Sequence, residues 1–454
     1  EQKEAVNKTA TYFKDFKRDE ENITPHFLWN AKMRFGKTFA AYKLAIEMKW
    51  KKILVLTFKP AVQNAWEFDL KTHKDFVNWQ FIAKDGNFYN DINDEFPIVC
   101  FGSFQDFLGK NELGGIKPKN EWVHNISWDC VIFDEYHYGA WRENAKELFE
   151  AEDKKEKQEL EGQYIDLCDE EMIPIKTNHF LYLSGTPFRA IESGEFIEEQ
   201  IFNWTYSDEQ KAKKNWDGEN NPYLELPRMI LMTYQLPESI KKVAIGGEFD
   251  EFDLNIFFSA VGEDREAKFV YENEVQQWLN LIRGQFSESI KDDLILGDKR
   301  PPFPYSDARL LSLINHSFWF LPSVSSCYAM KNLLYENHNI FFHDYEIIVA
   351  AGNKAGLGVK ALNPVFQAIG DPLRTKSITL SCGKLTTGVS VKPWSGILFL
   401  RNSSSPETYF QAAFRVQTPW VIYNPDGLNP NDKEIIKKEC YVFDFAPNRA
   451  LRLI

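Results

Sequence analysis

A glycine, a lysine and a threonine stand together at residues 36–38, where they could bind a phosphate group. They close the segment Ala31-Lys-Met-Arg-Phe-Gly-Lys-Thr38, which follows an apolar run at residues 27–30 and precedes a segment with one apolar face. A loop between a strand and a helix presents backbone N–H groups to an anion, and the helix dipole adds to the attraction. In such a loop Lys37 would bridge the β- and γ-phosphates of a nucleotide, and the Thr38 hydroxyl would ligate Mg²⁺.

The loop departs from the usual phosphate-loop pattern, G-x-x-x-x-G-K-[ST], at its first position, which is Ala31. Alanine fits there only if its φ angle is negative. The strand–loop–helix context predicts a nucleotide site, and a chance G-K-T triplet is the alternative. The residues expected to surround the phosphates are Met33, Arg34, Phe35, Gly36, Lys37 and Thr38.

Two adjacent carboxylates, Asp134 and Glu135, end an apolar run 97 residues after Lys37. We expect Asp134 to enter the Mg²⁺ shell, usually through water, and Glu135 to position and polarise the attacking water. The alternative is a strand that ends at an acidic turn without chemistry. His137 follows closely and is predicted to couple this site to events across a cleft, whereas a single histidine elsewhere is more often structural.

The elements that must position these residues are short apolar runs separated by helical stretches. The runs are continuous rather than alternating, as expected for strands that are buried on both faces. Strand and helix alternate, which predicts parallel sheets with crossover helices, and the eleven strands are too many for one small sheet but natural for two. The predicted fold class is therefore α/β. The predicted strands are residues 27–30, 53–58, 98–104, 130–135 and 180–184, followed by 229–234, 318–321, 346–351, 377–382, 396–400 and 441–445.

Two domains are predicted, over residues 1–225 and 226–454. A charged helical insertion is expected at about 140–175, because residues 142–172 hold 12 Asp and Glu against 5 Lys and Arg. A solvated surface helix is the plainest interpretation of such a segment. Glycines and prolines predict a second, partly helical insertion at about 236–305.

The composition of the 454 residues excludes some classes of function. Hydrophobic residues make up 44%, which is typical of a packed globular protein, and no run of 18 apolar residues occurs, so no membrane span is predicted. The six cysteines form no C-x-x-C pair, so we expect no zinc site, no disulfide framework and a reduced, cytoplasmic location. The net charge of −13 argues against binding nucleic acid by bulk positive charge, but a few placed phosphate contacts suffice.

The segment Asp134-Glu135-Tyr136-His137 is a DExH box, and with Arg34-Phe-Gly-Lys-Thr38 it resembles the superfamily 2 DEAD/DEAH-box helicases and translocases. The resemblance implies two tandem RecA-like domains that bind ATP and Mg²⁺ between them and grip a nucleic-acid backbone. Leu183-Ser-Gly-Thr-Pro187 is similar to the third motif of the family, whose hydroxyls, here Ser184 and Thr186, couple the ATP site to nucleic acid. Gln2 stands where the family often has an adenine-reading glutamine.

Four further segments are similar to family motifs. Thr57-Phe-Lys-Pro60 and Gly102-Ser-Phe-Gln105 are similar to motifs Ia and Ib, which normally touch the sugar-phosphate backbone. Phe320-Leu-Pro-Ser323 is similar to motif IV, and Leu385-Thr-Thr-Gly-Val-Ser390 to motif V, with serine at its end where aspartate is usual. The resemblance implies a nucleotide contact from Gly388 and nucleic-acid contacts from Lys59, Ser103, Ser323, Thr386 and Thr387.

The last motif combines a glutamine and an arginine. Ser405-Pro406 opens a predicted helix, with serine as N-cap and proline in the first position, and Gln411 and Arg415 share one face of it at i and i+4. Residues 411–415 resemble motif VI, Q-x-x-G-R-x-x-R, with Phe414 in place of the glycine and Thr418 in place of the second arginine. The resemblance implies catalytic roles for Gln411 and Arg415. Arg415 is then the only arginine of the motif left to stabilise charge on the γ-phosphoryl group.

Residues 33–38 together with residues 414–419 look most like the motors of ATP-dependent restriction and phage-defence enzymes. This resemblance implies an ATP-hydrolysing translocase or helicase that acts on double-stranded DNA, with nuclease or methyltransferase domains or subunits outside the fragment. An RNA helicase and an ATP-driven switch that needs no nucleic acid are the alternatives. A nuclease is a third alternative, because Glu266-Ala-Lys268 follows Asp250 and Asp253 in the manner of a nuclease motif.

Overall fold

The computed structural model divides the chain into two compact units, which are described separately. Within the described residues the first unit ends at Lys214 and the second begins at Asn215. The structure describes residues 1–17, 24–57, 62–83, 92–93, 95–103, 107, 121–134, 175–185, 196–244, 252–285, 301–352, 359–383, 385, 390–403 and 406–446.

The first unit is built on a parallel sheet. Its described strands are β1 (His26–Ala31), β2 (Lys52–Thr57), β3 (Gln80–Ala83), β4 (Ile98–Ser103), β6 (Cys130–Asp134), β8 (Phe180–Ser184) and β9 (Ile201–Trp204). These seven strands lie in the order β3-β4-β2-β6-β8-β1-β9, and each pair of neighbours is parallel.

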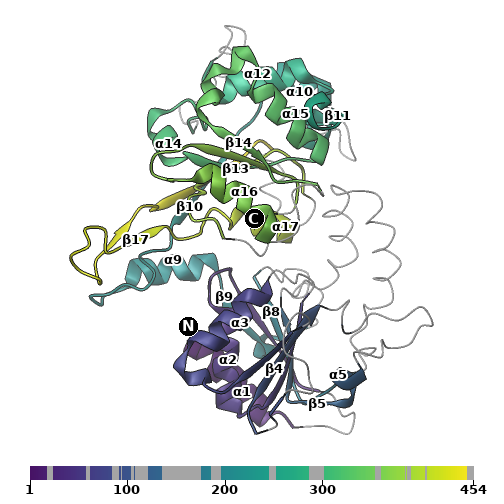
Figure 1. Ribbon diagram of the computed structural model, residues 1–454, viewed down its shortest axis with the longest axis vertical. Helices are drawn as coiled ribbons and strands as arrows, with labels where there is room; N and C mark the ends of the chain where they lie inside the picture. The colour runs from purple at the N-terminus through teal and green to yellow at the C-terminus, as the bar shows by residue number, and fades with distance from the viewer. Residues whose placement is uncertain are drawn as a thin grey trace. The chain divides into compact units, whose positions relative to one another are not determined.

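Hydrophobic cores lie on both faces of this sheet. Phe27 and Trp29 of β1 belong to one core, while Leu28 between them belongs to the other, which explains why the strand sequences are apolar throughout. The first core packs against α1 (Gln2–Asp15), α2 (Lys37–Met48) and α3 (Gln63–Thr72), which lie along the sheet in Figure 1. The other described elements are η2 (Lys74–Phe76), α5 (Glu121–Asn125), the parallel pair β5 (Ser127–Trp128) and β7 (Lys176–Thr177), η6 (Glu198–Gln200) and α9 (Tyr206–Asn215).

The second unit is also built on a parallel sheet. Its described strands are β10 (Arg228–Thr233), β13 (His316–Phe320), β14 (Glu346–Val349), β15 (Ser377–Ser381), β16 (Gly396–Phe399) and β19 (Glu439–Asp444). These six strands lie in the order β10-β19-β16-β13-β15-β14 with parallel neighbours throughout.

Helices cover both faces of the second sheet as well (Figure 1). One core includes residues of α10 (Glu238–Lys241), α11 (Leu254–Phe257), α12 (Glu272–Ile282), α14 (Ala308–Leu313) and α15 (Val324–Leu334), and the other includes residues of α16 (Val359–Ile369) and α17 (Pro406–Ala413). The remaining described elements are η7 (Lys242–Ala244), η8 (Asp264–Glu266), η9 (Asn337–Asp344) and two antiparallel pairs, β11 (Ala260–Val261) with β12 (Lys268–Phe269) and β17 (Val421–Tyr423) with β18 (Lys433–Ile435).

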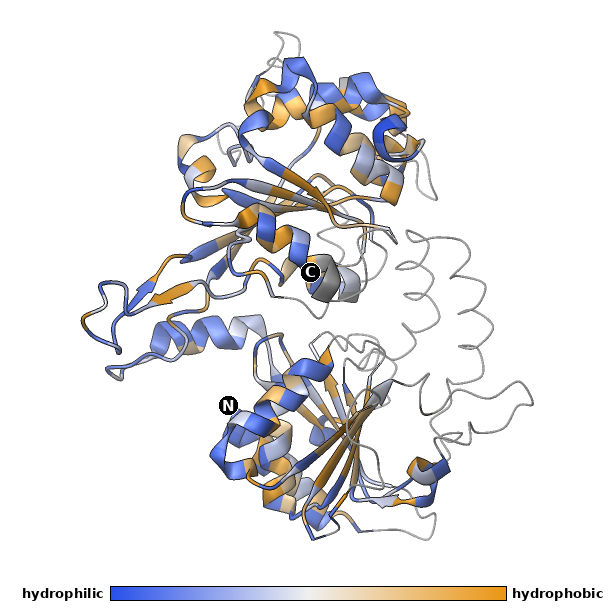
Figure 2. Ribbon diagram, in the orientation of Figure 1, coloured by the Kyte–Doolittle hydropathy of each residue, from blue (hydrophilic) through white to orange (hydrophobic). Residues whose placement is uncertain are grey.

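All of the predicted strands are confirmed, with ends that differ by a few residues. The predicted ends at Phe58, Phe104 and Glu135 lie outside the described residues. The strands β3 and β9 were not predicted, and they form the two edges of the first sheet. Figure 2 shows apolar residues concentrated along the strands of both sheets.

The segment predicted as a partly helical insertion at about 236–305 contains α10, α11 and α12 in its described part. The acidic segment 142–172 lies outside the described residues. The five described cysteines are all buried. Among the helices that the structure describes, none combines the length and apolarity needed to cross a membrane.

Candidate nucleotide-binding site

The carboxyl ends of the strands in the first sheet bring several predicted residues into one row. Thr57 at the end of β2 is paired with Ser103 of β4 on one side and with Asp134 of β6 on the other. Asp134 is paired in turn with Leu183, the neighbour of Ser184 on β8. The four polar side chains of this row are buried. The parallel strands therefore place the predicted metal-binding, coupling and backbone-contacting residues together at the carboxyl ends of the strands, where ligands of open α/β sheets bind.

The phosphate loop follows β1 at the same edge. Ala31 does not have a positive φ angle, so the condition for alanine at the first position of the loop is met. Arg34 and Gly36 do have positive φ angles, of 70° and 82°, which turn the loop back before α2 starts at Lys37. The loop therefore runs directly into the N-terminus of a helix, as the sequence predicts.

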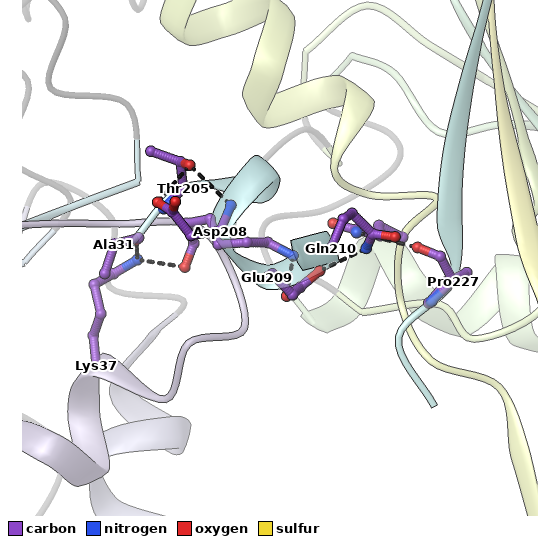
Figure 3. A network of polar contacts seen from close by, with 9 residues as sticks. Ala31, Lys37, Thr205, Asp208, Glu209, Gln210 and Pro227 are labelled. Atoms are coloured by element: carbon purple, nitrogen blue, oxygen red, sulfur yellow. Dashed lines mark hydrogen bonds and ion pairs between the residues drawn. The ribbon is translucent and has the colours of Figure 1, made fainter. Parts of the chain in front are cut away.

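The ammonium group of Lys37 lies over the loop. Its Nζ donates to the carbonyl oxygen of Ala31 at 2.6 Å and is 3.4 Å from that of Lys32 (Figure 3). Gly185, from the segment similar to the third motif, packs here: a Cβ added to it would lie 3.4 Å from the Met33 nitrogen and 3.7 Å from Lys37 Nζ. The segment after β8 thus borders the lysine and the loop, and Gly185 leaves room beside them.

Gln2 approaches the loop from α1. Its Nε2 donates to the carbonyl oxygen of Phe35 at 2.6 Å, and a Cβ at Gly36 would stand only 2.4 Å from that nitrogen. The sequence placed Gln2 at the nucleotide, and the structure places it against the loop that would hold the phosphates. Its contact with adenine stays a prediction.

Gly36 should be needed for two separable reasons, its positive φ angle and its contact with Gln2. We expect Gly36→Ala to cost about 1–2 kcal/mol of stability through backbone strain, and to weaken nucleotide binding by displacing Gln2. Gly427 is a matched control, because it has a φ angle of 70° and nothing within 4 Å of an added Cβ. Gly427→Ala should lose similar stability and keep full nucleotide affinity, as measured by thermal unfolding and by titration of a fluorescent ATP analogue. Equal nucleotide affinities for the two variants would contradict this prediction.

Asp134 is held by a residue that the sequence did not single out. Trp66 of α3, which is completely buried, donates from Nε1 to Asp134 Oδ2 at 2.7 Å. The Trp66 carbonyl oxygen accepts the Tyr42 hydroxyl of α2 at 2.9 Å. Burial raises the pKa of Tyr42 well above its usual value, and the charges of Asp69 and Asp134 raise it further. A tryptophan in an apolar helix position gives no signal in the sequence that it contacts a carboxylate.

A buried ion pair connects the loop to the last helix of the first unit. Lys32 Nζ and Glu209 Oε2 of α9 are 2.5 Å apart, with 2% and 3% of the two side chains exposed. The backbone nitrogen of Lys32 also donates to the Trp204 carbonyl oxygen at the end of β9. Thr205 and Asp208 cap α9 through reciprocal hydrogen bonds, seen with Glu209 in Figure 3. This pair could not be predicted from the sequence, because its members are 177 residues apart.

The oxygen donors at this edge fit Mg²⁺ in a nucleotide complex. Thr38 in the first turn of α2 and Asp134 at the end of β6 supply a hydroxyl and a carboxylate. Mg²⁺ prefers hard oxygen ligands and is usually bound through one or two carboxylates plus substrate phosphates. Within the described ranges there is no group of three or more His, Cys, Asp and Glu residues that could hold a metal ion.

The predicted residues of the second unit are also placed by the fold. Ser323 follows β13 and caps α15, because its Oγ accepts from the Ser326 nitrogen at 3.1 Å. Ser390 is exposed. The contact of Ser323 with nucleic acid stays a prediction.

The helix of the last motif is shorter than predicted. It begins at Pro406, as expected, but ends at Ala413, so Arg415 lies in the following turn and not on the helix. The helix tightens at its end, where the Arg415 nitrogen donates to the Ala412 carbonyl oxygen three residues back, and Thr418 Oγ1 donates to the Arg415 carbonyl. Arg415 and Gln411 are both buried and remain in contact through Arg415 Nε and the Gln411 carbonyl oxygen at 3.3 Å.

Comparisons with known proteins relate the chain to DNA-restriction systems. No protein-family model matches it. The chain is 32% identical, over 96% of its length, to a Mycoplasma pneumoniae protein described as the C-terminal part of a predicted type II restriction enzyme and methyltransferase. It spans 63% of the length of that relative. The chain is thus similar in sequence to part of a protein that is described as a restriction enzyme and methyltransferase.

The chain is also similar to parts of two solved structures. The ATP-dependent Type ISP restriction-modification enzyme LlaBIII, solved bound to DNA, matches 97% of the chain with a TM-score of 0.54 at 12% identity, over 27% of that enzyme. A fragment of a predicted HsdR subunit of a type I restriction enzyme from Vibrio vulnificus matches 100% of the chain and 64% of the fragment, with a TM-score of 0.48 at 14% identity. The predicted α/β class with two RecA-like domains is confirmed.

Several predicted site residues of the chain lie outside the described residues. They are Lys59, Glu135, His137, Thr186, Thr386, Thr387, Gly388 and the N-cap Ser405. Asp250, one of the residues of the nuclease alternative, also lies outside the described residues. Asp253 is described, and its carboxylate caps α11 by accepting from the nitrogens of Asn255 and Ile256, which is a structural role.

Proposed function

We propose that the chain is an ATP-dependent nucleic-acid motor, a translocase or helicase that hydrolyses ATP. The observation that carries the proposal is the meeting of the phosphate loop, Gly185 and the buried Asp134 at one edge of a parallel sheet. Each comes from a different strand end, and each matches a motif of one family in the expected order. A chance G-K-T triplet would not be expected to have a carboxylate-bearing strand and a third motif beside it.

The residues of the proposed site would act on ATP in distinct ways. Lys37 Nζ would exchange the carbonyl oxygen of Ala31 for phosphate oxygens, because a negatively charged acceptor binds an ammonium group more strongly than a neutral carbonyl does. Thr38 and Asp134 would hold Mg²⁺, which when bound neutralises charge on the phosphate oxygens. Glu135 would polarise the attacking water, and Arg415 would stabilise charge on the γ-phosphoryl group.

Double-stranded DNA is the proposed track. The relative from Mycoplasma pneumoniae is described as a predicted restriction enzyme and methyltransferase, and LlaBIII as ATP-dependent and bound to DNA. The chain spans only part of each, so we propose that nuclease or methyltransferase activity resides in domains or subunits beyond it, in the cytoplasm. Contacts to phosphate would place the motor on DNA with little sequence preference.

ATP turnover measured with duplex DNA, single-stranded DNA and RNA, at one fixed salt concentration, tests this proposal. We expect duplex DNA to stimulate turnover most, and the stimulation to weaken as salt rises, because phosphate contacts are salt-dependent. Stimulation by RNA alone would favour an RNA helicase. Turnover that no nucleic acid changes would favour an ATP-driven switch, and absence of turnover under all conditions would overturn the proposal.

A further inference from the structure

Trp66 contacts the carboxylate at the centre of the candidate site. Its Nε1 donates to Asp134 Oδ2 at 2.7 Å. An indole N–H can only donate, so the carboxylate is the acceptor in this bond. Trp66 is completely buried and 7% of Asp134 is exposed. A hydrogen bond to a carboxylate in such surroundings is stronger than one in water, and it restricts how the carboxylate can rotate.

The same tryptophan is attached to the helix that carries the phosphate-loop threonine. Tyr42 of α2 donates its hydroxyl to the Trp66 carbonyl oxygen at 2.9 Å, and the two rings meet edge to face, with centroids 5.3 Å apart. Tyr42 lies four residues after Thr38, so both are on one face of α2. One residue of α3 thus connects the carboxylate on β6 with the helix that begins at the phosphate loop.

We propose that Trp66 is a positioning residue that sets the Asp134 carboxylate relative to Thr38, so that the two can hold Mg²⁺ together with ATP. This inference rests on the proposed function. Groups that hydrogen-bond to metal-ligating carboxylates orient them and tune metal affinity. The indole is a neutral donor, so it orients the carboxylate without cancelling the negative charge that attracts the metal, as an arginine or lysine in its place would do.

Trp66→Phe tests the role, because it keeps an aromatic ring and removes the donor. We expect its affinity for a fluorescent ATP analogue in EDTA to stay within about twofold of wild type. The Mg²⁺ concentration that gives half of the metal-dependent increase in binding should rise about 10–100-fold. In turnover, saturating Mg²⁺ should restore most of the lost rate.

Trp128→Phe is the matched control. Trp128 is also completely buried, and its Nε1 donates to the Val123 carbonyl oxygen at 2.9 Å, in a different core. This variant loses the same donor but should keep the wild-type Mg²⁺ requirement. If Trp66→Phe fails to fold, Tyr42→Phe removes the attachment to α2 and should raise the Mg²⁺ requirement in the same direction, by a smaller factor.

The outcomes separate this inference from the proposed function. A Trp66→Phe protein that folds and keeps the Mg²⁺ requirement of the wild type and of Trp128→Phe would overturn the positioning role. If Trp66→Phe does not fold, an unchanged requirement in Tyr42→Phe would overturn it. If the wild-type protein binds no nucleotide in the presence of Mg²⁺, the proposed function itself would be contradicted.

Discussion

Replacing Lys37 by alanine should lower ATP turnover by a factor of about 10²–10³, the typical loss when one preorganised donor to developing charge is removed. The ammonium group of Lys37 donates to the carbonyl oxygen of Ala31 in the phosphate loop at 2.6 Å. Alanine leaves the loop backbone and the start of α2 intact, so the fold should persist. Steady-state turnover and nucleotide affinity, each with and without duplex DNA, are the measurements.

Lys43→Ala provides the control from the same helix. Lys43 pairs with Asp75 at the surface, with about a third of each side chain exposed, so its loss removes an equal charge away from the loop. This variant should turn over ATP at the wild-type rate. Undiminished turnover in Lys37→Ala would remove the proposed site, whatever Lys43→Ala does.

Breaking the ion pair between Lys32 and Glu209 should have the largest effect on stability. Either Lys32→Met or Glu209→Met leaves a charge in a site where only 2–3% of each side chain is exposed. The loss of one partner from such a buried pair costs about 3–5 kcal/mol, because the remaining charge has neither water nor its partner. The midpoint of thermal unfolding should fall by roughly 6–20 °C for a unit of this size.

The double variant distinguishes a buried charge from a packing defect. Replacing a buried ion pair by apolar residues of similar volume is often neutral or stabilising. Lys32→Met combined with Glu209→Met should therefore unfold at a higher temperature than either single variant. Additive losses in the double variant would mean that the two side chains stabilise the fold through separate contacts. Differential scanning calorimetry of all four proteins makes the comparison.

The strands could be predicted because of where they lie in the fold. A strand such as β2 is buried on both faces, so nearly every residue in it is apolar, and a continuous run remains visible in the sequence. The edge strands β3 and β9 contain the polar residues Gln80 and Asn203, so neither is a continuous apolar run of four residues. The edge strand β14 is equally short but could be predicted, because residues 347–351 are all apolar. The end of α17 was misplaced, because the i, i+4 spacing of Gln411 and Arg415 cannot tell a helix from a tightened last turn.

Some residues of the candidate site could likewise be predicted from the sequence, and others could not. Lys37, Gly36 and Asp134 could be predicted, because phosphate loops and acidic strand ends are local patterns. Trp66 lies 68 residues from its partner in the sequence, and no periodicity connects an indole in a helix with a distant carboxylate. Glu209 resembles any other glutamate of a charged helix until the fold buries it against the loop. Pairings of this kind are set by tertiary packing alone.

The first helix of the chain bears on how small a working fragment can be. Besides Gln2, α1 contributes Phe13 to the core. Lys8 Nζ donates to the Ile201 carbonyl oxygen at 2.6 Å, and the Thr9 hydroxyl oxygen accepts from the indole N–H of Trp29 at 2.7 Å. A truncation that starts at β1 would retain the whole phosphate loop. It would, however, expose the side of β1 that packs against α1, and the buried indole N–H of Trp29 would lose its acceptor. The shortest fragment able to bind nucleotide should therefore include α1, which lies upstream of the phosphate loop.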